Sequence, residues 1–383
     1  MMMNHGIHRI YGMVLLAVAA LGTSLAAFAA DPGITVSARQ RYPWNGLVDL
    51  HFTITGDAGV KYDTSFTAKD MVGNTNIAMK TIRKADGTAA AAKEQLMPDT
   101  YNWVWDAAAD LPKDFKCDRV TVTGTAVEHK YLYMVIDLSG GANASSYPVS
   151  YLNDIPSGGW SDVYKTSKLV LRHCSAGKFI MDQSGTSKAH DVTLTKAFYI
   201  GIFEITQRQY ELITGGNSET SGWKYPKVRI SWNDIRGATK GVAFPSNIEC
   251  DSYSFIGKVR ARTSFETFDL PSEAQWQYAC VADGNLGDSV GSDYPLEVGS
   301  KKPNGWGIYD MLGNVEEWTT DRYTSYGKTA LVDPVGGTSS GVRIIKGAYC
   351  RQSSSFYPGY RYNNSPSYVN DFCGFRVCVT LSE

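Results

Sequence analysis

Apolar and polar residues alternate along the first part of the chain. In the segment 47–55, every second residue from Val48 to Ile54 is apolar, and the residues between them are polar. This alternation is typical of a β-strand with one buried face. Similar signals occur at residues 64–68, 101–105 and 120–127. Each of these segments is therefore predicted to be a short strand.

Short strands at this spacing predict an all-β sandwich of immunoglobulin-like type over residues 30–130. No cluster of His, Cys or carboxylate residues accompanies the strands. The lone His51 is interpreted as a solvated strand residue. We therefore expect this domain to be a structural or binding module.

The composition changes between residues 131 and 167. An apolar run, YLYMVIDL, is followed by a stretch rich in Gly, Ser and Pro that ends at Trp160. Such residues are typical of turns and linkers. We predict a linker region over 131–167, although the run 131–138 fits either neighbouring domain.

After Lys168 the pattern indicates strands mixed with two capped helices. Thr206 and Ser272 each begin a capping box, and the two predicted helices end near Gly215 and Gly284. The predicted strands form a hairpin at 169–172 and 178–181, a strand at 198–204 and a last strand at 374–379.

Beyond these elements, residues 168–383 show little regular periodicity, so we expect an α+β domain that is mainly irregular. Long ordered loops need support from a metal or from disulfides. Two domains also agree with the length of the chain, because one ordinary core rarely extends over 383 residues.

The N-terminus is typical of a secretory signal peptide over residues 1–29. A weakly basic start with Arg9 precedes an apolar run, and the small residues Ala27 and Ala29 fit a cleavage site. We expect a secreted, periplasmic or cell-surface protein. The alternative is an uncleaved anchor helix. No later segment is apolar for long enough to span a membrane, so no span is expected after cleavage.

The net charge of −1 gives no electrostatic reason to expect a nucleic-acid partner. All seven cysteines follow the predicted signal peptide, at positions 117, 174, 250, 280, 350, 373 and 378. An oxidising compartment allows disulfides, and the odd number leaves at least one thiol unpaired unless it links two chains. Cys373 and Cys378 are not expected to pair, because they fall on opposite faces of a regular strand.

The segment 303–318, PNGWGIYDMLGNVEEW, combines three glycines with oxygen-bearing side chains. The oxygen donors are Asp310, Asn314, Glu316 and Glu317. Glycine permits tight or left-handed backbone, and oxygen ligands on a bent loop are what calcium requires. The alternative is a glycine-rich turn with solvated acids.

Six collinear motifs resemble the formylglycine-generating enzyme, or sulfatase-modifying factor, family. They are FYIGIFEITQRQY at 198–210, VRISWNDI at 228–235, LPSEAQWQYAC at 270–280, the segment 303–318, IIKGAYC at 344–350 and GFRV at 374–377. The resemblance implies a C-type-lectin-like fold variant with bound calcium. The family includes oxidases, iron-dependent sulfoxide synthases and members with no known catalysis.

The resemblance implies four ligands for a structural calcium ion. Asp310 and Glu317 would contribute side-chain oxygens, and Gly313 and Val315 would contribute backbone carbonyls. Glu316 departs from the family pattern, in which Trp is usual, and is expected to point away from the ion. The alternative is that Asp310 and Glu317 accept amide hydrogen bonds from the loop without a metal.

The family's oxidase activity needs two cysteines, about six and eleven residues after the Arg of an Arg-Gly-Gly-Ser motif, because paired thiolates bind copper(I). In this chain Lys346 takes the place of the Arg, and the two offsets fall on Gln352 and Tyr357. Copper and catalytic residues are therefore not expected. An iron site built from His173, His190 and a distant acid stays open as an alternative.

The segment 351–371 interleaves aromatic residues with Asn, Ser and Arg, which is typical of adaptable recognition surfaces. The candidate ligand-binding residues are Tyr357, Tyr360, Arg361, Tyr362 and Asn364. The alternative is that Arg361 and the asparagines only hold loops in place.

Together these features predict an exported, non-catalytic, calcium-stabilised module that binds an extracellular glycan or protein. The alternative function is a formylglycine-generating or other metal-dependent oxidase that acts on protein cysteine. A third possibility is a purely structural component of the cell envelope.

Overall fold

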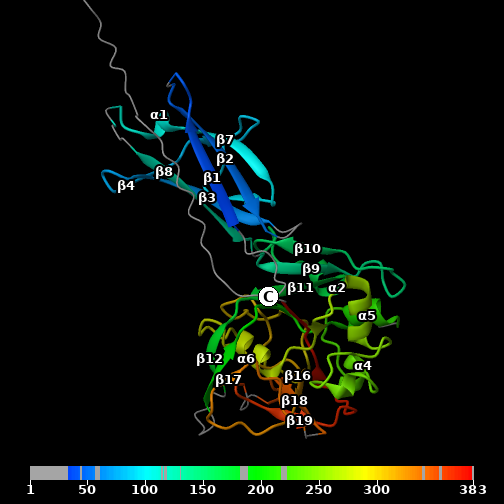
Figure 1. Ribbon diagram of the computed structural model, residues 1–383. Helices are drawn as coiled ribbons and strands as arrows, with labels where there is room; N and C mark the ends of the chain where they lie inside the picture. The colour runs from blue at the N-terminus through cyan, green and yellow to red at the C-terminus, as the bar shows by residue number, and fades with distance from the viewer. Residues whose placement is uncertain are drawn as a thin grey trace, which may run out of the picture. The chain divides into compact units, whose positions relative to one another are not determined.

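The computed structural model of the chain divides into two compact units, Met1–Lys130 and Tyr131–Glu383 (Figure 1). The structure describes residues 33–43, 45–56, 61–113, 115, 119–129, 131–181, 189–216, 222–338, 341–352 and 356–381. The predicted signal peptide and Cys117 lie outside these residues. Among the described helices, none combines the length and the apolar character that crossing a membrane requires.

The first unit contains two β-sheets. Its elements are β1 (Gly33–Gln40), β2 (Leu47–Thr55), β3 (Tyr62–Asp70), β4 (Thr75–Ile77), β5 (Ile82–Arg83), β6 (Glu94–Leu96), β7 (Thr100–Asp106), α1 (Ala107–Asp110) and β8 (Val120–Glu128). One sheet has the order β1-β2-β7-β5, and the other has the order β4-β3-β6 with β8 paired to β3.

An aromatic core joins the two sheets of the first unit. The ring of Phe52 on β2 lies 4.8 Å from that of Phe66 on β3 and 5.1 Å from that of Trp103 on β7. Phe52 is fully buried, as the alternation in its strand predicts. His51 is exposed on the opposite face, where it contacts Asn102. The immunoglobulin-like classification of this unit stays a prediction.

The second unit is mostly β with few helices. Its strands are β9 (Tyr133–Asp137), β10 (Val149–Leu152), β11 (Lys168–Cys174), β12 (Gly177–Met181), β13 (His190–Leu194), β14 (Phe198–Gly201), β15 (Phe268–Asp269), β16 (Glu316–Arg322), β17 (Leu331–Val332), β18 (Arg343–Lys346), β19 (Tyr362–Asn364), β20 (Cys373–Gly374) and β21 (Cys378–Thr380). They form sheets with the orders β10-β9-β11-β14-β21-β15, β12-β13-β17 and β19-β18-β16-β20.

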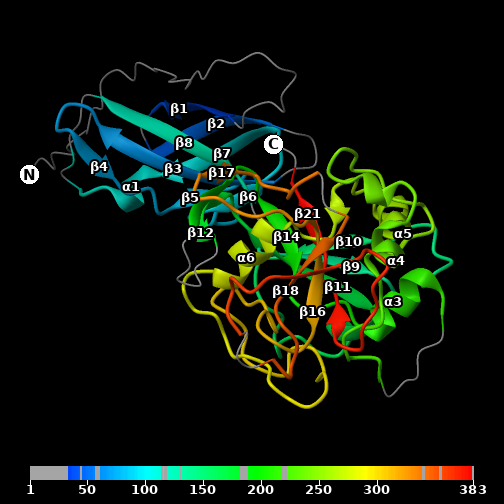
Figure 2. The ribbon, with the colours of Figure 1, turned by 90° about the horizontal axis from the view of Figure 1, so that it is seen from below.

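The helices of the second unit pack on these sheets or on one another. They are α2 (Val163–Thr166), α3 (Gln207–Thr214), α4 (Trp232–Arg236), the 3₁₀ helix η2 (Gly241–Ala243), α5 (Phe255–Thr263) and α6 (Glu273–Val281). Helices α3, α4 and α5 gather on one side of the unit, away from α6 (Figure 2). Helix α6 contacts β12, β13, β16 and β18.

Local capping signals predicted two of these helices. Thr206 and Ser272 form complete capping boxes at the starts of α3 and α6, which confirms both starts. Two further helices of at least five residues were not predicted. Helix α4 begins with a capping box at Ser231, and α5 is capped by Ser254.

The prediction of a linker over 131–167 was wrong. These residues form β9, β10 and α2, and β9 lies inside the six-stranded sheet between β10 and β11. Four of the five residues of β9 are buried, because the strand is covered on both faces. The apolar run 131–138 therefore belongs to the second unit.

Two strand predictions also need correction. The segments 169–172 and 178–181 do not form a hairpin, because β11 pairs with β9 and β14 whereas β12 pairs with β13. The predicted last strand divides into β20 and β21, which belong to different sheets. Cys373 and Cys378 are both free thiols, so they do not pair with each other, as predicted.

Candidate functional site

The loop 303–318 is folded tightly into the second unit. Asp310 and Asn314 adopt positive φ angles of 59°, and both side chains are buried. Gly313 has a φ of 98°, and a Cβ at this position would lie 2.4 Å from the Val290 carbonyl oxygen. The close approach and the left-handed backbone both require glycine here. The loop is therefore not a solvated turn.

Glu317 is committed to an internal ion pair. Arg376 donates two hydrogen bonds of 2.6 Å to the carboxylate oxygens of Glu317, and the indole N–H of Trp276 donates a third of 2.8 Å. All three side chains are fully buried or nearly so. Both oxygens of Glu317 therefore already have strong donors.

Asp310 lies beside a second buried acid, Glu204, which follows β14. One oxygen of Asp310 accepts a hydrogen bond of 2.6 Å from the Gly299 amide, and one oxygen of Glu204 accepts from the Asn314 side chain at 2.9 Å. The other oxygens, Asp310 Oδ1 and Glu204 Oε2, have no partner in the described part of the chain. Burial raises the pKa of both carboxyl groups, and their mutual repulsion raises that of Glu204 further.

These residues fit the predicted calcium ligands only in part. Asp310 offers a free buried oxygen, whereas a cation at Glu317 would compete with the guanidinium of Arg376. The Gly313 and Val315 carbonyls belong to the same buried loop. Within the described ranges, no group of three or more His, Cys, Asp or Glu side chains is placed to hold a metal. A calcium ion here would need carbonyl or water oxygens as well, which it accepts readily.

Sequence reasoning missed Glu204. The signal was present in the motif at 198–210, where this one acid interrupts an otherwise apolar run. An acid in such a position must be paired or neutralised when the strand is buried.

The positions matched to the motif's Arg and to the two copper thiolates carry other groups. Lys346 is fully buried and lies 3.5 Å from Glu273. Gln352 accepts a hydrogen bond of 3.4 Å from the Tyr360 hydroxyl, and the Tyr357 ring is exposed. The nearest cysteine in the sequence, Cys350, is buried, and burial raises the pKa of its thiol.

The two histidines of the iron alternative belong to different sheets. His173 lies on β11 and His190 lies on β13, and both are buried. Their rings pack on Tyr199 and Tyr326, with ring centroids 5.2 and 4.8 Å apart. This arrangement gives each histidine a packing role.

Three predicted ligand-binding tyrosines lie together. Tyr357 and Tyr362 are each 39% exposed, and the ring of Tyr360 meets that of Tyr357 edge to face at 6.1 Å. Asn364 differs, because its side-chain oxygen accepts the Ser365 amide within the same turn. The tyrosines present an aromatic surface, while Asn364 shapes the loop.

Arg361 is engaged in an internal ion pair, and its predicted binding role stays a prediction. Its guanidinium donates to both carboxylate oxygens of Glu273, at 2.6 and 2.9 Å, and also donates to the Thr324 carbonyl. It also stacks over the Tyr326 ring, 4.0 Å from the centroid. These contacts are internal, which agrees with the alternative that Arg361 holds the loop in place.

The carboxyl group of Glu316 lies close enough to Tyr360 to interact with it electrostatically. It is only 3% exposed, and burial raises the pKa of its carboxyl group to about 7. Burial raises the pKa of Tyr360 and of Tyr368, and the charge of Glu316 raises both further. Side chains alternate between the two faces of a strand, so Glu316 and Glu317 point to opposite faces of β16.

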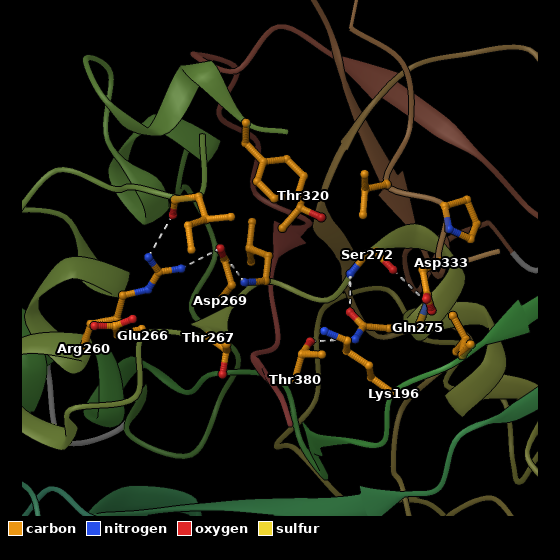
Figure 3. A pocket seen from close by; sticks show the side chains of 16 residues that line it. Lys196, Arg260, Glu266, Thr267, Asp269, Ser272, Gln275, Thr320, Asp333 and Thr380 are labelled. Atoms are coloured by element: carbon orange, nitrogen blue, oxygen red, sulfur yellow. Dashed lines mark hydrogen bonds and ion pairs between the residues drawn. The ribbon is translucent and has the colours of Figure 1, made fainter. Parts of the chain in front are cut away.

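A separate pocket of about 360 Å³ lies beside β15 and β21 (Figure 3). Its walls are mainly apolar and include Phe244, Ile248 and Leu270. At one end Arg260 reaches Asp269, and at the other Gln275 links Ser272 to Thr380 (Figure 3). None of the predicted site residues is among the described residues that line the pocket. The lining residues come from several short segments that lie far apart in the sequence, so no local motif predicts this pocket.

Comparison with known proteins identifies relatives of this chain. Formylglycine-generating enzymes from Streptomyces coelicolor and Mus musculus are each 27% identical, over 181 and 190 residues. These alignments cover 42% and 41% of this chain, and 55% and 51% of the relatives, so the chain spans about half the length of these enzymes. The serine/threonine-protein kinase Pkn1 of Chlamydia trachomatis is 32% identical over 130 residues, which cover 28% of this chain and 20% of the kinase.

Two solved structures are also similar. Treponema denticola variable protein 1 matches with 21% identity and a TM-score of 0.44, over 55% of this chain and 95% of that protein. PvdO from Pseudomonas aeruginosa matches with 23% identity and a TM-score of 0.41, over 55% of this chain and 94% of that protein.

The family profile of the sulfatase-modifying factor enzyme 1-like domain matches residues 167–381, which is more than half of the chain. This range contains β11 to β21 and all six collinear motifs. The chain therefore belongs to the sulfatase-modifying factor enzyme 1-like domain family.

Proposed function

We propose that this protein is an exported, non-catalytic binding module that is stabilised by calcium and recognises an extracellular glycan or protein. The observation that carries the proposal is the position and exposure of Tyr357. It stands at the position matched to the family's second copper thiolate, and its ring is 39% exposed. A phenol there cannot serve as a soft copper ligand, but it offers a contact surface.

The neighbouring side chains support a binding role. Tyr357, Tyr360 and Tyr362 supply rigid aromatic area together with hydroxyl groups, and Glu316 supplies a buried acid beside them. Aromatic rings pack against the apolar faces of sugars and of peptide side chains, and hydroxyl and carboxyl groups add directional hydrogen bonds. This combination suits recognition of a polar, extended ligand.

A binding experiment tests the proposal. The purified chain is passed over immobilised glycans and over immobilised extracellular proteins, and binding is measured by surface plasmon resonance. Tyr357→Ala and Tyr362→Ala should each weaken binding at least tenfold. Tyr42→Ala is the matched control, since that ring is 99% exposed and lies outside the family domain. Equal binding by all three variants would contradict the proposed surface.

The competing function is oxidation of a protein cysteine, since the relatives from Streptomyces coelicolor and Mus musculus are formylglycine-generating enzymes. The purified chain is incubated with copper, oxygen, a thiol reductant and a sulfatase-derived peptide that contains cysteine. We expect no formylglycine by mass spectrometry. Its formation at a rate proportional to protein concentration would overturn the non-catalytic proposal.

A further inference from the structure

The pocket beside β15 and β21 has apolar walls that remain exposed to solvent. Its volume is about 360 Å³, and its described lining residues all belong to the second unit. The walls include Ile248, which is 57% exposed, and Val335, which is 38% exposed. Exposed apolar side chains that gather in one hollow are typical of a binding site, because a ligand can remove them from water.

The loop that carries Phe244 and Ile248 is held in place by arginines. The Ile248 carbonyl accepts hydrogen bonds from Arg236, at 3.1 Å, and from Arg260, at 2.8 Å. The Phe244 carbonyl accepts one of 3.2 Å from Arg343, and the Arg236 guanidinium lies 4.8 Å from the centroid of the Phe244 ring. Hydrogen bonds from charged donors are the stronger ones. The walls are therefore fixed before a ligand binds, which lowers the entropic cost of binding.

Several polar side chains of the pocket are already paired with one another (Figure 3). Asp269 accepts two hydrogen bonds from Arg236, at 2.7 and 2.8 Å, and one of 2.9 Å from Arg260. The Gln275 side chain donates a hydrogen bond of 2.9 Å to the Thr380 hydroxyl, and its oxygen accepts a backbone amide at 3.0 Å. A sugar would lose its hydrogen bonds to water and find few free partners here, whereas an apolar ligand needs none.

The charged side chains around the pocket balance one another. The two arginines that pair with Asp269 leave one positive charge, and Glu266, on the same side as Arg260, supplies one negative charge (Figure 3). Lys196 and Asp333 contribute one charge of each sign on the other side (Figure 3). An ionic ligand would lose hydration in the pocket without meeting an excess of opposite charge. The charge balance therefore favours an uncharged ligand.

We propose that this pocket is a binding site for a small, uncharged and mainly apolar organic molecule, such as an aliphatic alcohol or an aromatic ring compound. Its volume lies within the range of about 300 to 1,000 Å³ that is usual for small-molecule sites. Burial of the exposed walls supplies the driving force. None of the tyrosines proposed for glycan or protein binding is among its described lining residues, so this site is separate from the tyrosine surface.

The test compares two fluorescent probes that share one ring system. N-phenylnaphthylamine is uncharged, whereas anilinonaphthalenesulfonate carries a sulfonate on the same rings. Each probe is titrated into the full folded chain, and the rise in fluorescence is measured. The uncharged probe should bind at one saturable site, at least tenfold more tightly than the sulfonate. Hexanol should displace the uncharged probe, and glucose should not.

Ile248→Asn and Val335→Asn place a polar amide in the apolar wall and should each weaken binding of the uncharged probe at least fivefold. Both side chains are partly exposed, so the fold should tolerate the changes, and circular dichroism checks this. Ile155→Asn is the matched control, because Ile155 is 44% exposed and is not among the described lining residues. It should change the affinity less than twofold.

Two further variants separate this site from its alternatives. Lys196→Gln should change the affinity for the uncharged probe less than twofold, and Tyr357→Ala should bind that probe as the wild type does. A wild type that does not bind the uncharged probe, or that binds the sulfonate more tightly, would overturn the inference. Equal weakening by Ile155→Asn and the two wall variants, or loss of probe binding in Tyr357→Ala, would also overturn it, since the probe would then bind elsewhere.

Discussion

Arg361 and Glu273 form a bidentate ion pair that joins the segment before β19 to the first turn of α6. The guanidinium donates to the two carboxylate oxygens at 2.6 and 2.9 Å. The side chain of Glu273 is 1% exposed and that of Arg361 is 15% exposed. Tyr326 donates a further hydrogen bond to the same carboxylate. Although burial raises the pKa of Glu273, the charges of Lys346 and Arg361, together with these hydrogen bonds, keep it below its usual value.

Removal of Arg361 should therefore destabilise the fold. Arg361→Ala leaves the buried Glu273 carboxylate without its bidentate partner, and such a loss costs about 3 to 5 kcal/mol. The measurement is the free energy of unfolding from urea denaturation.

Arg229→Ala is the control for this change. Arg229 pairs with Asp371 at the surface, where the side chains are 73% and 58% exposed. Loss of an exposed pair costs about 1 kcal/mol or less. If both variants lose equally little stability, the Arg361–Glu273 pair is not the internal support that its burial indicates.

The N-cap of α3 gives a smaller and more local prediction. The Thr206 side chain accepts a hydrogen bond of 3.2 Å from the Gln209 amide and donates one of 2.8 Å to the Lys165 carbonyl. Thr206→Ala should cost about 1 to 2 kcal/mol of unfolding free energy in urea denaturation. Thr206→Ser keeps the hydroxyl and should retain most of the stability. A serine variant as unstable as the alanine variant would exclude the hydroxyl as the cause.

The elements that could be predicted from the sequence are those with local signals. The alternation from Val48 to Ile54 lies within β2, and the capping boxes at Thr206 and Ser272 begin α3 and α6. In each case the decisive residues lie within one strand or one helical turn. Such elements can be predicted because the hydrogen bonds of the capping box and the alternation of the strand involve only neighbouring residues in the sequence.

The features that could not be predicted depend on distant residues. Glu204 meets Asn314 across 110 positions, and Arg361 meets Glu273 across 88 positions. Loop 303–318 was correctly chosen as a special segment, but its composition alone does not show that Glu317 is already paired. The position of β9 inside the sheet likewise follows from pairing with β11, which no local pattern reveals.

The described cysteines should differ strongly in reactivity. Cys280 is fully buried, and burial raises the pKa of its thiol to about 12. Cys250 is only partly buried. Because the thiolate is the reactive form, Cys250 should be alkylated by iodoacetamide at least ten times faster than Cys280 in the native protein.

Mass spectrometry of peptides after a short labelling pulse measures both rates. In urea the two thiols should react at similar rates, which controls for differences between the peptides. Cys250→Ser should remove the faster reaction and leave the labelling of Cys280 unchanged. Equal native rates would contradict the buried position of Cys280.

The buried carboxyl group of Asp321 on β16 should make the free energy of unfolding depend on pH. Its carboxylate accepts hydrogen bonds from the Glu273 amide and the Thr320 hydroxyl, at 2.9 and 3.0 Å. Burial, with a smaller effect of the Glu273 charge, raises its pKa to about 7. An unfolded Asp has a pKa of about 3.9, so the folded state binds the proton more tightly. This stabilisation is complete below about pH 4 and is lost as the pH rises to about 7.

Asp321→Asn removes this titration but keeps an oxygen acceptor for both donors. The unfolding free energy of the variant relative to the wild type should therefore rise between pH 5 and pH 8, by at most about 3 kcal/mol. Urea denaturation of both proteins at the two pH values measures the difference. Other buried acids with raised pKa values, such as Glu316, titrate equally in both proteins and cancel in the comparison. A difference that stays constant from pH 5 to pH 8 would show that Asp321 is already ionised in the folded protein at pH 5.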